Sequence, residues 1–273
     1  MTYFIDMLSS SCPLILCSIG ALFSEYAGIL ALFIDGTVTF SAFLTYAFTL
    51  TTNSPLLGSI ISCLITTSTI FCFTLLIEKF KANKFIAAMA INLLLSALPS
   101  CFSSLAYNTR GVLTSTSFSF EINTVKLISI ILTVLLVAFA IIFLLKTRPG
   151  LYIRITGTDS AVLKSNGINP MHTRILSWCF AAFFSSIAGS LLTFRINSFV
   201  PNISSGRGWM ALCAVFMGKK KPFKIIIAVL IFCFADFFAA NIQNILPQLP
   251  SSVYISFPYL LIFIFVLCNR RIV

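Results

Sequence analysis

The chain has 273 residues, of which 59% are hydrophobic and only 9% are charged. A soluble domain carries about 25% charged residues, so this composition excludes a protein that water surrounds on all sides. The formal net charge of +11 would suit a nucleic-acid partner. The placement of the basic residues along the chain explains the charge in another way, and we predict no nucleic-acid partner.

The basic residues are distributed asymmetrically between the connections that join the apolar segments. Fourteen lysines and arginines fall in one alternate set of connections, and four fall in the other set (Arg110, Lys126, Arg195 and Arg207). Lys and Arg accumulate on the cytoplasmic side of membrane proteins, so the larger set predicts the cytoplasmic face. Several apolar runs approach the roughly 20 residues that a helix needs to cross a bilayer, and no alternating barrel pattern occurs. The fold class is therefore an all-α polytopic membrane protein.

The first half of the chain contains four predicted crossings. The first apolar run ends at Asp35-Gly36, and no basic residue precedes it, so we expect a retained membrane segment and not a cleaved signal peptide. A basic connection at residues 78–84 separates the third crossing from the fourth. The four crossings are predicted at about residues 12–34, 37–52, 56–77 and 85–105.

The second half of the chain contains five further predicted crossings after a polar external loop at residues 106–124. One of them is too short to cross alone at about 1.5 Å per residue, so we expect a half-helix or a crossing that continues through residues 204–208. The predicted segments are residues 125–145, 175–194, 209–218, 225–245 and 253–268. The total is about eight to nine transmembrane helices, including the short one, with an external N-terminus.

Four polar side chains lie within or beside these predicted spans: Glu25, Asp35, Asn92 and Asp236. Charged and strongly polar groups inside a membrane are costly and face protein or water instead of lipid. Two roles remain open for each of them. Either the side chain lines a pore, or it braces two packed helices through a hydrogen bond.

The longest polar interruption, residues 154–169, predicts a short cytoplasmic helix. Thr158 or Asp159 can cap its first turn, and Gly167 stands where a left-handed residue commonly ends a helix. About eight residues are too few for a helix that is stable alone in water. We therefore expect this helix to dock, either on its own bundle or the membrane surface, or on a partner protein.

The residues offer no catalytic, metal-binding or nucleotide-binding pattern. The single histidine lies in a polar loop far from any cysteine cluster, the nine cysteines stand singly in apolar runs, and no phosphate-binding loop occurs. We expect no enzyme activity, no cofactor, and cysteines that act as small buried hydrophobic residues. The scarcity of buried acids and bases also argues against a proton- or sodium-driven transporter, so the driving force is expected from another protein.

Three stretches, in order, resemble the permeases of ATP-binding-cassette (ABC) importers for simple sugars and nucleosides. Residues 25–36 resemble that family's "ERAGVLNLGLEG" signature, although Tyr26 and Ala31 differ from it. Residues 157–168 resemble its cytoplasmic coupling helix, with Thr158-Asp159-Ser160 in place of the usual Asn-Pro. Residues 204–236 resemble its "AGRGFIALAAVIFG…FGFAD" block.

The resemblance implies one transmembrane permease domain over residues 1–273, with a cytoplasmic coupling loop at residues 146–174, in the bacterial inner (plasma) membrane. It also implies three protein partners: a separate cytoplasmic ATPase, a second permease chain that makes a heterodimer, and a substrate-binding lipoprotein. The solute is expected to be a nucleoside in preference to a simple sugar. The ATPase contact carried over by position consists of Asp159, Ser160, Ala161, Val162, Leu163, Lys164, Ser165, Asn166 and Gly167. The alternative is a secondary transporter or channel that works without an ATPase.

Overall fold

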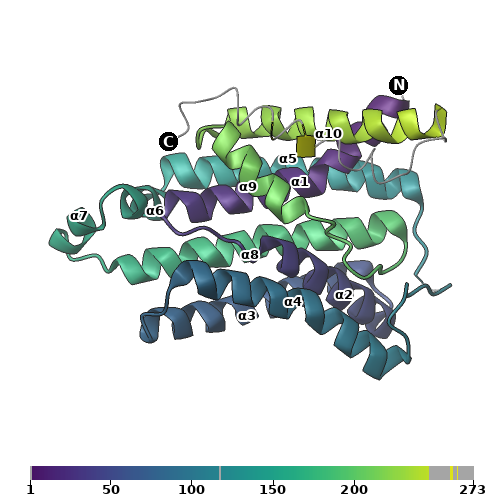
Figure 1. The fold of residues 1–273 in the computed structure, drawn as a ribbon, viewed down its shortest axis with the longest axis horizontal. Coiled ribbons are helices and arrows are strands. Elements are labelled where there is room, and N and C mark those ends of the chain that lie inside the picture. The colour runs from purple at the N-terminus through teal and green to yellow at the C-terminus, as the bar shows by residue number, and fades with distance from the viewer. Residues whose placement is uncertain (1, 117, 246–258, 261–262, 264–273) are drawn as a thin grey trace.

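A computed structural model describes residues 2–116, 118–245, 259–260 and 263 of the chain, and nearly all of them are helical or in short turns (Figure 1). In that part, six helices are long and apolar enough to cross a membrane: α1 (Thr2–Tyr26), α3 (Pro55–Lys79), α4 (Lys84–Tyr107), α5 (Ile122–Lys146), α8 (Pro170–Ile196) and α10 (Pro222–Ile245). The all-α, multi-pass fold predicted from composition is confirmed.

Four shorter helices complete the described part: α2 (Ile34–Thr52), α6 (Arg148–Thr158), α7 (Ser160–Ser165) and α9 (Arg207–Met217). The 11 residues of α9 extend over about 16 Å, roughly half of a bilayer core. The prediction of a short helix before the basic residues 219–224 is therefore confirmed.

Local sequence signals explain where several helices begin. Pro55, Pro170 and Pro222 occupy the first residues of α3, α8 and α10, where the missing N–H of proline breaks no helical hydrogen bond. The side chain of Asn169 accepts a hydrogen bond from the Met171 N–H at 2.9 Å and caps α8. These polar and proline positions separate apolar runs that composition alone would not divide.

Helix α8 lies in the middle of the bundle, packed against α1, α2, α3 and α5 (Figure 1). Helices α1 and α8 are mostly buried, whereas α3, α4 and α5 expose apolar side chains along one face. Of the cysteines that the structure describes, Cys12, Cys17 and Cys233 are buried as expected, but Cys72 and Cys101 are exposed on α3 and α4. The outer faces of α3, α4 and α5 are suited to contact lipid.

One boundary prediction was wrong. The first apolar span is Ile5–Tyr26 and not residues 12–34, and it ends early because Gly28 adopts φ = +72° and turns the chain back into the bundle. Helix α5 ends at Lys146, and Pro149 lies in the first turn of α6, where the missing N–H of proline breaks no helical hydrogen bond. The predicted crossing at 253–268 lies largely outside the described residues.

Candidate translocation site and coupling module

The helices α2 and α9 begin beside each other near the middle of the bundle (Figure 1). Asp35, in the first turn of α2, accepts a hydrogen bond from the Gly208 N–H of α9 at 3.0 Å. A Cβ atom on Gly208 would come within 2.5 Å of the Asp35 N, so only glycine permits this approach. We call the meeting point of these two helix starts the α2–α9 junction.

A second buried polar residue supports the same junction from α4. The Asn92 side-chain oxygen accepts a hydrogen bond from the Gly36 N–H at 2.7 Å, and Asn92 is only 9% exposed. The first N–H groups of a helix have no partner within the helix, and inside a membrane each needs one. Asp35 supplies such a partner at the start of the short helix α9, and Asn92 supplies one at the start of α2.

Residues 203–207, where the chain enters α9, form hydrogen bonds with α2 and with one another. Thr39 of α2 donates a hydrogen bond to the buried Ser204 hydroxyl at 3.0 Å. The half-buried Arg207 guanidinium donates to the Ile203 carbonyl at 3.1 Å, and Tyr259 donates to the Ser205 carbonyl at 3.1 Å. An arginine and a tyrosine are thereby held next to the α2–α9 junction.

Asp236 differs from the other candidate residues because its carboxylate is exposed. It lies on α10 between the buried residues Cys233 and Ala239, on the face that packs against the bundle. Within the described part of the chain no hydrogen bond or ion pair joins it to another residue, although the Arg207 guanidinium interacts with it electrostatically. Charged groups within a membrane face protein or water instead of lipid, so Asp236 is kept as a candidate pore residue.

Glu25 lies at the basic end of the bundle, which we define as the end formed by residues 78–84, 146–174 and 219–224. Its carboxylate forms an ion pair with the Lys220 ammonium at 2.9 Å. The neighbouring Tyr26 hydroxyl donates to the Lys220 carbonyl at 2.5 Å. The sequence suggested a carboxylate inside a span, and the structure places it in the last turn of α1, joined to the connection between α9 and α10.

The predicted coupling helix forms α7 at the basic end (Figure 1). Asp159 accepts a hydrogen bond from the Ala161 N–H at 2.8 Å, and Gly167 has φ = +75°, so Asp159 is the predicted cap and Gly167 the left-handed residue. Leu163 is buried and Ser160 is half-buried, whereas the remaining residues of the predicted contact are exposed: Asp159, Ala161, Val162, Lys164, Ser165, Asn166 and Gly167.

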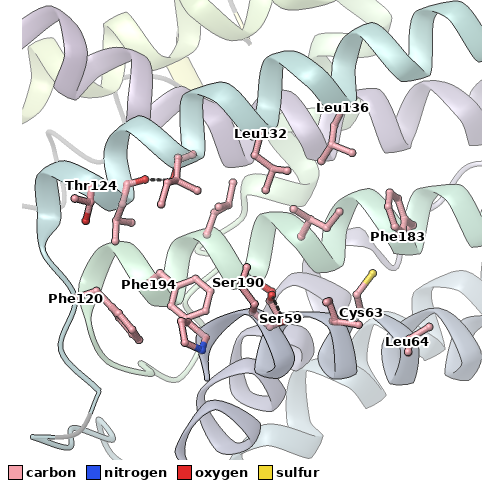
Figure 2. Close-up of a pocket in the computed structure, with 18 of the residues that line it drawn as sticks. Ser59, Cys63, Leu64, Phe120, Thr124, Leu132, Leu136, Phe183, Ser190 and Phe194 are labelled. Carbon is pink, nitrogen blue, oxygen red and sulfur yellow. Dashed lines mark hydrogen bonds between the residues drawn. The ribbon is translucent and has the colours of Figure 1, made fainter. Parts of the chain in front are cut away.

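A groove of about 720 Å³ that the sequence did not reveal runs between α3 and α5 over α8 (Figure 2). Its lining combines Phe120, Phe183 and Phe194 with aliphatic side chains and a few hydroxyls. A polar solute would lose its hydrogen bonds to water there without replacing them. The groove is therefore unsuited to hold a nucleoside or sugar, and the surroundings of Asp236 and the α2–α9 junction remain the candidate site.

A half-length helix such as α9, which begins at a polar junction inside a helical bundle, is typical of membrane transport proteins. The family model described as the permease component of branched-chain amino acid transport systems matches residues 3–267. The chain belongs to this family of transport permeases, and it is a multi-pass cell-membrane protein.

Three curated relatives are similar along most of their length. The nucleoside ABC transporter permease protein NupC of Lactococcus lactis is 24% identical over 93% of this chain and 87% of its own. The guanosine ABC transporter permease protein NupQ of Bacillus subtilis is 26% identical, over 91% and 86%. The putative glucose ABC transporter permease protein TsgC13 of Haloferax volcanii is 24% identical, over 85% and 75%.

A solved structure shows a similar fold. PsaBC from Streptococcus pneumoniae, in complex with Fab, superposes with a TM-score of 0.59 over 95% of this chain and 88% of that chain. The sequence identity is 13%, so this likeness concerns the fold alone.

Proposed function

We propose that this chain is a permease subunit of an ABC importer that takes up nucleosides, with simple sugars as the other solute class. A separate ATPase docks on α7, a second and different permease chain completes the pore, and a lipoprotein outside the membrane delivers the solute. Family membership and the solutes named for two nucleoside permeases and one glucose permease support the importer class.

The proposal of an ATPase partner rests on the exposed surface of α7. A six-residue helix is too short to be stable by itself, and α7 buries only Leu163 fully against the rest of the chain. Ala161 and Val162 present apolar surface where a soluble partner can reach it. A docked protein would bury these side chains and stabilise the helix.

We place the solute path beside Asp236, Arg207 and Asp35. Carboxylates accept hydrogen bonds from hydroxyl groups, and bonds to a charged group are stronger than neutral ones. Ribose and simple sugars both present several hydroxyls, so one polar site suits both solute classes. Asp35 already accepts from the Gly208 N–H, whereas no hydrogen bond joins Asp236 to another residue in the part of the chain that the structure describes.

The experiment for the importer function is uptake into vesicles that contain this chain, its partner permease and the ATPase, supplied with the binding protein. Replacing Val162, which is 44% exposed, by aspartate buries a charge in the docking surface. We expect ATP-dependent uptake of labelled guanosine to fall at least about tenfold, since one uncompensated buried charge costs several kcal/mol.

Val112→Asp is the matched control, because Val112 is 53% exposed in the connection between α4 and α5 and far from α7. It is expected to leave uptake unchanged. Uptake that needs no ATP, or that Val162→Asp leaves intact in the assembled complex, contradicts the proposed function.

Asp236→Asn tests the solute path. The substitution keeps the shape of the side chain but removes its charge, and we expect the KM for guanosine uptake to rise about tenfold, because a hydrogen bond to a charged group is worth about 1.5–3 kcal/mol. The rise should be smaller for 2′,3′-dideoxyguanosine, which lacks the ribose hydroxyls. Glu121→Gln, at an exposed carboxylate outside the bundle, serves as control. An unchanged KM would exclude Asp236 from the path.

A further inference from the structure

We propose that residues 25–36 form a clamp that holds both ends of α9 and passes the movement of α6 to it, so that α9 is the moving gate of the permease. This inference rests on the proposed importer function. Residues 25–36 contact α6, the start of α9, and the connection between α9 and α10.

Both ends of α9 are joined to the clamp. At its C-terminal end, the Lys220 ammonium pairs with Glu25 and the Lys220 carbonyl accepts from the Tyr26 hydroxyl. At its N-terminal end, the Gly208 N–H donates to Asp35. The clamp therefore contacts α9 at the basic end and again at the α2–α9 junction, and α9 spans the distance between these two contacts.

The clamp also contacts α6, which lies in the predicted coupling loop at residues 146–174, and the two backbones meet directly. A Cβ atom on Gly157 of α6 would overlap the Tyr26 carbonyl oxygen and lie 2.9 Å from the Gly28 N. A Cβ atom on Gly28 would lie 3.1 Å from the Gly157 Cα. No flexible side chain separates the two elements, so a displacement of α6 has to displace residues 26–28 as well.

The interior of the clamp is closely packed and braced by a hydrogen bond. Ala27, Ala31 and Phe33 are each at most 1% exposed. The Ser24 hydroxyl accepts a hydrogen bond from the Ala31 N–H at 3.2 Å. Close-packed segments of this kind transmit strain instead of absorbing it.

Helices α2 and α9, which share the junction, are held by polar contacts of different kinds. Helix α2 is held to α8 by buried hydroxyl pairs, between Thr37 and Ser185 and between Thr45 and Ser190, each at 2.8 Å. The ion pair at the other end of α9 is accessible to water, with the Lys220 side chain 51% exposed. Exposed ion pairs are weak and can open and close readily, as a gate requires.

Exchanging the charges of the ion pair tests the gate. The variants are Glu25→Lys, Lys220→Glu and the double exchange, with Lys221→Glu as a control that changes the same charge on the exposed neighbour. Each complex is placed in vesicles, and the efflux of labelled guanosine is measured without ATP. We expect each single variant to raise efflux about fivefold, because repulsion replaces attraction in a partly screened pair. The double exchange should restore the wild-type rate.

Tyr26→Phe provides a second variant that removes a single hydroxyl and leaves all charges in place. It should also raise efflux, while Lys221→Glu should not. Single variants that leak no more than wild type, or a double exchange that leaks as much as they do, would overturn the inference. Wild-type uptake that does not depend on ATP would contradict the proposed function instead, and the passive efflux of the variants would still decide whether α9 is a gate.

Discussion

Gly189→Val is expected to prevent the bundle from assembling, the largest structural effect of any substitution considered for this chain. A Cβ atom on Gly189 of α8 would overlap both the Ser41 hydroxyl oxygen and the Val38 carbonyl oxygen of α2, and lie 3.1 Å from the Ala42 N. Two of these three atoms belong to the α2 backbone, so a rotamer change cannot relieve the overlap. Overpacking costs about 1–3 kcal/mol even where side chains can adjust, and valine needs more space than alanine.

Gly189→Val would also disturb the hydroxyl contacts between α2 and α8, because these contacts lie beside Gly189. The Thr193 hydroxyl donates to the Ala42 carbonyl at 3.2 Å, next to the Thr45–Ser190 pair. Separating α2 from α8 would leave these buried groups without partners in a medium that offers none.

The measurement for Gly189→Val is the yield of monodisperse protein in detergent and its thermal unfolding temperature. We expect Gly189→Ala to lower that temperature and Gly189→Val to leave little folded protein. Gly111→Val is the control, since a Cβ atom there meets only the Thr109 hydroxyl oxygen, at 3.5 Å. Normal yield and stability of Gly189→Val would show that α2 and α8 do not meet as the structure describes.

The features predicted correctly from the sequence depend on neighbours within a few residues. The apolar runs, the cap at Asp159 and the left-handed Gly167 are all local, and the hydrogen bond that confirms the cap joins residues only two apart. The shortness of α9 followed from basic residues at its end and from helix rise alone. Such local signals predict where helices occur and at which of their ends the basic residues lie.

The features that the sequence did not predict depend on contacts between distant residues. Asp35 and Gly208 are 173 residues apart, and Gly36 and Asn92 are 56 apart. A carboxylate that braces a helix and one that faces a polar space have the same pattern in a sequence. Packing in three dimensions distinguishes the braced Asp35, Asn92 and Glu25 from the uncovered Asp236.

Gly157→Val is expected to abolish ATP-dependent uptake while leaving the membrane bundle folded. The added side chain has to displace either α6 or residues 26–28, since the space beside Gly157 is occupied by the backbone of that turn. Helix α6 lies at the basic end, where the Thr156 and Thr173 hydroxyls form a pair with α8 at 2.7 Å. Because α6 is not one of the six long apolar helices, we expect it to shift without unfolding them.

A shift of α6 would break the backbone contact between Gly157 and residues 26–28 of the clamp. At a cost of about 1–3 kcal/mol for overpacking, the docked arrangement becomes roughly five- to 150-fold less populated. Uptake per ATP hydrolysed is the quantity to measure, because ATPase activity itself should persist. Thr158→Val, the neighbouring exposed position on α6, should behave as wild type. A normal ratio of uptake to hydrolysis in Gly157→Val would mean that the force of the ATPase reaches the pore by another route.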